Sequence, residues 1–161
     1  MPLADPVLIR PAQPGDHEAW LAMRRALWPF AQPDEMASEL PAMLANPEQT
    51  AFIAETASGR LAGLIELAIR GQGLDGEPDR HGFIEGWYVA PDCRRQGIGR
   101  QLVERAEAWV GQQGCQTMGS DTDDRFAGSR AAHQALGYQV IRRTTHFRKA
   151  LEPHDGSTPT G

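Results

Sequence analysis

The sequence predicts an α/β fold in which helices flank a mixed sheet, and two observations carry this prediction. The chain has 161 residues, 40% of them hydrophobic, which suits one domain with a buried core. Its apolar spacing alternates between the period of strands and that of helices, in the order βααβββαβαββ. We expect a single domain over residues 1–151. A tail over 152–161 lacks apolar residues and is expected to be disordered.

The first three elements are a strand and two helices. A short apolar run over 7–10 predicts the strand, which a proline closes. Asp16 can cap a helix over 17–27, whose large apolar side chains share one face. A second helical pattern spans 34–45, although Pro41 argues against its continuity.

The middle of the chain reads as antiparallel strands. The runs 51–56 and 61–69 flank a turn that contains glycine and predict a hairpin. Residues 71–80 are rich in glycine, aspartate and proline and are expected to form a loop. The apolar run over 82–89 is expected to be a central strand.

The last third alternates between helices and strands. Apolar residues at helical spacing predict a helix over 97–112, and a glycine follows it. A short strand over 116–120 and a helix over 127–136 come next. The runs 138–141 and 144–147 are expected to be the last two strands.

The junction between the central strand and the third helix is the most informative segment. Residues 89–99 read Val-Ala-Pro-Asp-Cys-Arg-Arg-Gln-Gly-Ile-Gly. Gly97 and Gly99 let the backbone approach a ligand, and the N–H groups of a helix start favour an anion. Positive charge is added by Arg94, Arg95 and Arg100. The segment therefore predicts a pyrophosphate site, although it lacks both the G-x-G-x-x-G spacing and the P-loop lysine.

Charge and cysteine content narrow the possible partners and the compartment. Acidic residues outnumber basic ones by 21 to 16, a net charge of −5, which argues against nucleic acid and suits a cationic small molecule. Cys93 and Cys115 are expected to be reduced thiols of a cytoplasmic protein. We expect no membrane partner, because the N-terminus shows no signal peptide and no apolar stretch approaches about 20 residues. The five histidines and two cysteines show no metal-ligand spacing, so we expect no metal.

The motif R-x-x-G-x-G after a strand that ends in valine resembles the acetyl-CoA site of the GCN5-related N-acetyltransferases (GNAT). The order of elements matches that fold over residues 7–149. The resemblance implies a mixed, mostly antiparallel sheet with a splayed strand pair that receives acetyl-CoA as co-substrate. The residues implied in binding acetyl-CoA are Trp87, Tyr88, Val89, Arg94, Arg95, Gln96, Gly97, Ile98, Gly99 and Arg100.

Other segments resemble the aminoglycoside 6′-N-acetyltransferases of Gram-negative bacteria. The segments that carry this resemblance are Leu27-Trp28-Pro29, Ala68-Ile69-Arg70 before a loop ending in Asp75-Gly76, Phe83 to Val89, Gly114-Cys115, Ser120-Asp121-Thr122, His133 to Tyr138 and Phe147-Arg148-Lys149. The resemblance implies acetylation of the 6′-amine of an aminoglycoside. It also implies a homodimer that pairs through the last strands.

Three residues are expected at the acceptor. The resemblance places Trp28 near the sugar rings, and makes Glu85 and Asp121 acceptor contacts and candidate bases. Each also has a structural interpretation: a core tryptophan at a helix end, a carboxylate in a salt bridge, and an aspartate that caps a turn.

Three positions depart from the family patterns. Gly73 stands about where the subfamily often has a tyrosine, and Phe126 stands where it often has an asparagine that reaches CoA. His133 occupies the place of a tyrosine that protonates the leaving thiolate in the wider superfamily. A histidine can act as an acid near neutral pH, but it can equally be a structural, partly buried residue.

The expected reaction is direct attack of the amine in a ternary complex. Glu85 or Asp121 takes the proton of the ammonium, and a backbone N–H near Val89 binds the thioester oxygen. Gly86 permits a bulge that opens the cofactor slot. Two alternatives stay open: an acetyltransferase for another amine, such as a polyamine or a protein N-terminus, and a non-catalytic module that binds acyl-CoA.

Overall fold

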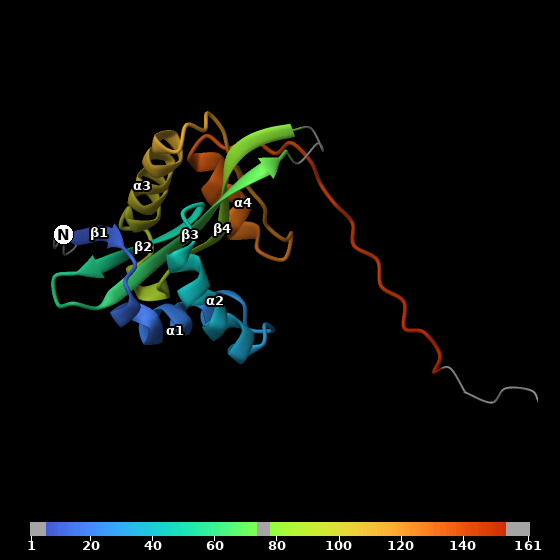
Figure 1. Ribbon diagram of the computed structural model, residues 1–161, viewed down its shortest axis with the longest axis horizontal. Coiled ribbons are helices and arrows are strands. Elements are labelled where there is room, and N and C mark those ends of the chain that lie inside the picture. Colours follow the sequence, from blue (N-terminus) through green and yellow to red (C-terminus); the bar gives the residue numbers. More distant parts are fainter. Residues whose placement is uncertain (1–5, 74–77, 154–161) are drawn as a thin grey trace, which may run out of the picture. The chain divides into compact units, whose positions relative to one another are not determined.

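The computed structural model describes residues 6–73 and 78–153 of the chain (Figure 1). The chain divides after Asp123 into two units, which are described separately. The single domain expected over 1–151 stays a prediction. Asp75 and Gly76, which carry part of the subfamily resemblance, lie outside the described residues, as does most of the expected tail.

The first unit contains a five-stranded sheet whose strands follow one another in sequence order. Neighbouring strands are antiparallel except for the last pair, which is parallel. The expected mixed, mostly antiparallel sheet is therefore confirmed. The strands are β1 (Val7–Pro11), β2 (Gln49–Thr56), β3 (Leu61–Gln72), β4 (Pro78–Val89) and β5 (Met118–Ser120).

Helices cover both faces of this sheet, with α1 and α2 on one side and α3 on the other (Figure 1). Pro41 lies inside α2 without ending it, because buried side chains before and after it hold one face of the helix against the core. The helices of this unit are α1 (His17–Leu27), α2 (Pro33–Ala45) and α3 (Ile98–Gln112), with short 3₁₀ turns η1 (Pro14–Asp16) and η2 (Pro91–Cys93). No helix among the described residues is long and apolar enough to cross a bilayer.

The hairpin of β3 and β4 is longer than the composition predicts. Residues 71–80 were expected to form a loop, but Arg70 pairs with His81 and Gln72 with Pro78. Cross-strand pairing therefore extends both strands into the polar segment, where local propensity alone favours a loop. The ladder thereby includes Arg70 and sets it beside His81 of β4.

A buried ion pair joins α1 to β3. Glu66 is 0% exposed and Arg24 is 5% exposed. Arg24 Nε donates to Glu66 Oε1 at 2.7 Å, and Trp20 Nε1 donates to the same oxygen at 2.7 Å. Arg24 also donates to the Met36 carbonyl and to Glu39 on α2, at 3.0 and 2.7 Å. One arginine thus connects both helices of this face to the sheet.

A β-bulge lies opposite this ion pair. The register of β3 and β4 shifts between Glu66, which faces Gly86, and Leu67, which faces Ile84, so Glu85 is the extra residue. A Cβ on Gly82 would meet Val110 of α3, whereas one on Gly86 would meet Trp28 after α1. Two positions four residues apart on a regular strand share a face, so the bulge has reversed the alternation. The bulge expected at Gly86 is confirmed.

The second unit begins with α4 (Ala127–Ala135). The strands expected over 138–141 and 144–147 are absent, because residues 138–153 form neither helix nor strand. Val140, Ile141 and Phe147 are exposed, at 50%, 73% and 93%. A strand is stabilised only when its N–H and C=O groups find a partner strand, and the described residues of this unit provide none for this segment of β-type sequence.

The buried ion pair predicts the effect of Arg24→Met. The substitution leaves the Glu66 carboxylate buried without its cation, so we expect the free energy of unfolding to fall by about 3–5 kcal/mol in urea titrations. Arg25→Met is the matched control, because Arg25 is exposed on the same helix, and we expect a change within about 0.5 kcal/mol. An equal fall in the free energy of unfolding of the two variants would contradict the proposed contribution of this ion pair to stability.

Candidate active site

Two carboxylates stand where β4 and β5 stop pairing. The parallel ladder ends at the pair of Ile84 and Ser120. Glu85 and Asp121 are the next residue on each strand, and we call this point the β4–β5 fork. Glu85 is half-buried and Asp121 is exposed. The fork therefore places both candidate bases one residue beyond the last β4–β5 pair, although they are far apart in the sequence.

Beyond the fork, two backbone N–H groups of β4 point away from β3. The Ala90 N–H donates to the Ala62 carbonyl at 2.9 Å, and the antiparallel register continues back to Gly86. Because hydrogen-bonded and non-hydrogen-bonded pairs alternate, the N–H groups of Trp87 and Val89 face the side on which β5 has ended. These are the donors that an oxyanion site near Val89 requires.

The arginine-rich loop between β4 and α3 has the geometry of an anion site. Gly97 is the N-cap of α3 with φ +81°, a conformation that side chains disfavour. The first turn of α3 has no acidic residue and no side-chain cap, so its N–H groups face outward. Arg94 Nε donates to the Val89 carbonyl at 2.9 Å, which ties the loop to the strand end. Exposed residues line the loop: Arg94, Arg95, Gln96 and Arg100.

An ion pair from the β2–β3 turn holds the start of this loop. Arg60 donates to both oxygens of Asp92, at 2.6 and 2.8 Å. The hydrogen bond from Arg60 lowers the pKa of Asp92 to about 2 from 3.8. This carboxylate therefore stays ionised, and the ion pair persists, throughout the neutral range.

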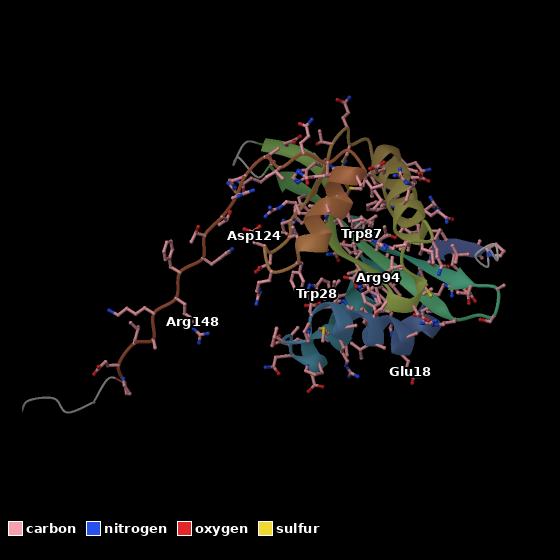
Figure 2. The ribbon with its side chains drawn as sticks, turned by 180° about the vertical axis from the view of Figure 1, so that it is seen from behind. Glu18, Trp28, Trp87, Arg94, Asp124 and Arg148 are labelled. Carbon is pink, nitrogen blue, oxygen red and sulfur yellow. The ribbon has the colours of Figure 1, made fainter. Side chains whose placement is uncertain are left out.

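Not every residue expected at the donor site offers a side chain to it. Ile98 is 3% exposed and belongs to the core, and Tyr88 packs against the core cluster of α1, α2 and the sheet. A Cβ on Gly99 would lie 3.1 Å from the Trp87 ring. Gly99 thus lets α3 approach β4 closely, a packing reason for glycine in addition to the one expected from a pyrophosphate. Figure 2 shows Trp87 and Arg94.

Trp28 lies at the end of α1, against the bulged strand (Figure 2). A Cβ on Gly86 would lie 2.7 Å from the Trp28 ring, so glycine is required there for contact. The guanidinium carbon of Arg24 lies 5.2 Å from the centroid of the same ring. Trp28 is half-buried, so it packs as a helix-end tryptophan against Gly86 and stays partly accessible.

Glu85 forms the ion pair that its structural interpretation anticipated. Arg70 donates to Oε1 at 3.1 and 2.9 Å through Nε and Nη2, and Nη2 donates to Oε2 at 2.8 Å. The side chain of Glu85 is nevertheless 31% exposed and that of Arg70 is 41% exposed. Pairing therefore leaves the carboxylate accessible, and the ion pair and an acceptor role are compatible.

His133 belongs to the second unit, and its role in the reaction stays a prediction. Its Nδ1 lies 2.7 Å from the Ser129 carbonyl oxygen, which can only accept, so Nδ1 carries a hydrogen. The ring also makes an edge contact with Tyr138, 5.9 Å between centroids. In the neutral tautomer Nε2 is then an acceptor, so only the imidazolium can donate a proton from that atom.

Three residues of the site were missed by sequence reasoning: Arg24, Glu66 and Arg70. Arg24 lies four residues after Trp20, on the apolar face of α1, and Glu66 lies inside an apolar strand. The argument applied to Glu85, that a carboxylate within an apolar run must be used or paired, applies equally to Glu66. Arg70 gave no such signal, because it lies between the strand expected over 61–69 and the loop expected over 71–80, and neither pattern indicates Glu85 as its partner. Among the described residues, no cluster of histidine, cysteine or acidic side chains could hold a metal ion.

Comparisons with known proteins agree with this geometry. A family model, the acetyltransferase (GNAT) family, matches residues 18–138. Aminoglycoside N(6′)-acetyltransferase type 1 of Stenotrophomonas maltophilia is 38% identical over 94% of this chain and 98% of its own length. The protein of that name from Serratia marcescens is 39% identical over 84% and 96%. The structure of AAC(6′)-Iy with the bisubstrate analog CoA-S-monomethyl-acetylneamine has a TM-score of 0.82 at 30% identity, covering 91% of this chain and 99% of that chain.

The contact between Gly86 and Trp28 predicts the effect of Gly86→Ala. The new methyl group would displace Trp28, so we expect about 1–3 kcal/mol of destabilisation in urea unfolding and a changed tryptophan fluorescence of the folded protein. Gly111→Ala in α3 is the control, because a Cβ there meets nothing within 4 Å. That control should gain about 0.5–1 kcal/mol. A Gly86→Ala protein with wild-type stability and fluorescence would show that Trp28 does not depend on this glycine.

Proposed function

Because this chain belongs to the acetyltransferase (GNAT) family, we propose that it transfers the acetyl group of acetyl-CoA to the 6′-amine of aminoglycosides. One observation carries the proposal: proteins named for this activity are 38–39% identical over nearly their whole length. The β4–β5 fork adds the two carboxylates that a cationic acceptor needs. The product is an amide, and the aminoglycoside loses one positive charge.

The donor side consists of the fork and the loop that follows β4. The N–H groups at the start of α3, with the exposed arginines of the loop, would hold the pyrophosphate of acetyl-CoA. A similar solved structure, AAC(6′)-Iy, is titled as a complex with CoA. The N–H groups of Trp87 and Val89 would bind the thioester oxygen as it becomes an oxyanion.

The acceptor side is formed by Trp28, Glu85 and Asp121. The tryptophan offers an apolar ring to a sugar, and the two carboxylates bind ammonium groups through charge-assisted hydrogen bonds. A net charge of −5 favours approach of a polycation. Gly73 stands about where the subfamily often has a tyrosine that contacts the sugar, so one acceptor contact common in the subfamily is missing here.

Proton transfers accompany the chemical step. The attacking ammonium first loses a proton, directly or through water, to Glu85 or Asp121. The free amine attacks the thioester carbon in the ternary complex, the C–N bond forms and the C–S bond breaks. The CoA thiolate leaves and takes a proton, for which the His133 imidazolium is the candidate donor. The amide nitrogen loses its remaining extra proton to solvent, from which the histidine is protonated again. Cys93 and Cys115 are free thiols, in keeping with a cytoplasmic protein.

The activity prediction is tested by thiol release from acetyl-CoA with a panel of amines. We expect turnover of kanamycin and tobramycin and none of an analogue with a hydroxyl group in place of the 6′-amine. Glu85→Gln should lower kcat/KM by roughly 10²–10⁴ if Glu85 is the base or the main anchor, and Asp121→Asn should cost less. A loss in kcat at saturating drug indicates the base, and a loss confined to KM indicates anchoring.

Three outcomes of that assay would contradict the assignment. Acetylation of a polyamine or a peptide N-terminus with kanamycin untouched would make this an acetyltransferase for another amine. Binding of acetyl-CoA without thiol release in the presence of any amine would make it a non-catalytic module. Full activity of Glu85→Gln would remove Glu85 from the site.

We also propose a homodimer formed through the C-terminal segment. Residues 144–147 have a strand-like sequence but form no strand within their unit, and Phe147 is 93% exposed. Pairing with a second copy would satisfy both the backbone and this apolar surface. Sedimentation velocity at micromolar concentration should give twice the monomer mass of 17.6 kDa. A monomer at that concentration would refute the dimer.

A further inference from the structure

We propose that Arg70 is a positioning residue of the acceptor site, which fixes the direction of the Glu85 carboxylate. This inference rests on the proposed function, because it assigns Arg70 to the site where the acceptor amine binds. Arg70 lies near the end of β3, between the strand expected over 61–69 and the loop expected over 71–80. It comes beside Glu85 only because the β3–β4 hairpin extends to Gln72.

The bulge creates the need for such a residue. Each regular position of β4 faces a partner on β3, which limits the direction of its side chain. Glu85 is the extra residue between Ile84 and Gly86 and has no partner of this kind. Its carboxylate is instead fixed by three hydrogen bonds from Arg70, between 2.8 and 3.1 Å. A planar guanidinium that contacts both oxygens sets the plane of the carboxylate as well as its position.

Arg70 is itself held in place by an aromatic ring. Its guanidinium carbon lies 3.5 Å from the centroid of Phe83, whose side chain is 1% exposed. The Phe83 ring meets His81 edge-on at 6.3 Å, and a Cβ on Gly119 of β5 would lie 3.1 Å from it. The ring is therefore confined by β4 and β5 together. A stacked guanidinium on a confined ring is a rigid platform for Glu85.

The two arginine–glutamate pairs of this chain differ in access to solvent. The Arg24–Glu66 pair has side chains 6% and 1% exposed, so no ligand can reach it, and its role is structural. The Arg70–Glu85 pair has side chains 41% and 31% exposed and lies at the fork. A carboxylate has about four lone-pair sites, so Glu85 can accept from an acceptor ammonium while Arg70 holds it. Arginine does not give up its proton, so its contribution is orientation and not acid catalysis.

A double-mutant cycle tests this assignment. Arg70→Met, Glu85→Gln and the double variant are compared by kcat/KM for kanamycin, by KM for acetyl-CoA and by Tm. We expect Arg70→Met to lower kcat/KM for kanamycin by roughly 10–10²-fold, because a displaced carboxylate contacts the amine poorly, with the acetyl-CoA KM unchanged. In the Glu85→Gln background the same change should cost less than about 3-fold, because Arg70 acts through Glu85. Arg70→Lys should recover part of the loss, since lysine keeps the charge but not the fork geometry.

Arg80→Met is the matched control. Arg80 lies on β4, its side chain is 49% exposed and it also contacts a carboxylate, Glu48 at 3.6 Å. It is expected to leave kcat/KM for kanamycin within about 2-fold of wild type, as for an ordinary surface ion pair.

Several results would overturn the proposal. These are additive losses in the cycle, wild-type activity of Arg70→Met, or a loss that Arg80→Met reproduces. A fall in Tm with no recovery in Arg70→Lys would indicate a purely structural ion pair. The proposed function fails separately, when the wild-type protein itself does not acetylate kanamycin. The cycle is then run with whichever amine of the panel is acetylated, and the proposal falls if none is.

Discussion

The fold of the first unit depends on a single buried charge pair, that of Arg24 with Glu66. Burying two ions costs free energy, and this cost is offset only because every polar atom of the pair finds a partner. Arg24 donates to both oxygens of Glu66 on β3, to the Met36 carbonyl on α2 and to Glu39, while Trp20 adds a second donor to Glu66 Oε1. The position of α1 on the sheet is therefore specified by directional bonds as well as by apolar packing. The same ion pair helps to fix the position of Trp28, because Trp28 directly follows α1 and its ring lies against the Arg24 guanidinium.

The bulge at Glu85 converts this scaffold into a site. Without the extra residue, Gly86 would face α3 as Gly82 does, and Trp28 would lose its packing contact with Gly86. The bulge also lies where β5 stops pairing with β4. At Glu85, therefore, the alternation of the β4 side chains reverses and the pairing with β5 ends. The side chain at position 85 is therefore only partly buried. A glutamate in that place needs an external partner, and the long β3–β4 hairpin supplies one.

Sequence reasoning succeeded for features that depend on residues close together in the sequence. The α3 helix, the glycine N-cap at Gly97 and the bulge at Gly86 are local, and each is found in the structure. Pairing between distant residues could not be predicted: Arg70 meets Glu85 only because polar residues joined the β3–β4 ladder. The prediction of the last two strands was wrong for a related reason. A strand-like sequence forms a strand only beside a partner strand, and the described residues of this unit provide none.

Strand β4 serves the two sides of the fork with different chemical groups. Toward the donor it offers the N–H groups of Trp87 and Val89, and the loop after it relies on glycine conformation and a helix start. Toward the acceptor it offers the side chain of Glu85, which Arg70 holds by hydrogen bonds, and Gly86, against which Trp28 packs. Backbone groups are the same for any residue, so donor binding constrains the sequence mainly to glycines and arginines at fixed spacing. Acceptor recognition by side chains can change without disturbing the donor. The donor motif is therefore one contiguous segment of the sequence, whereas the acceptor residues Trp28, Glu85 and Asp121 come from three separate segments.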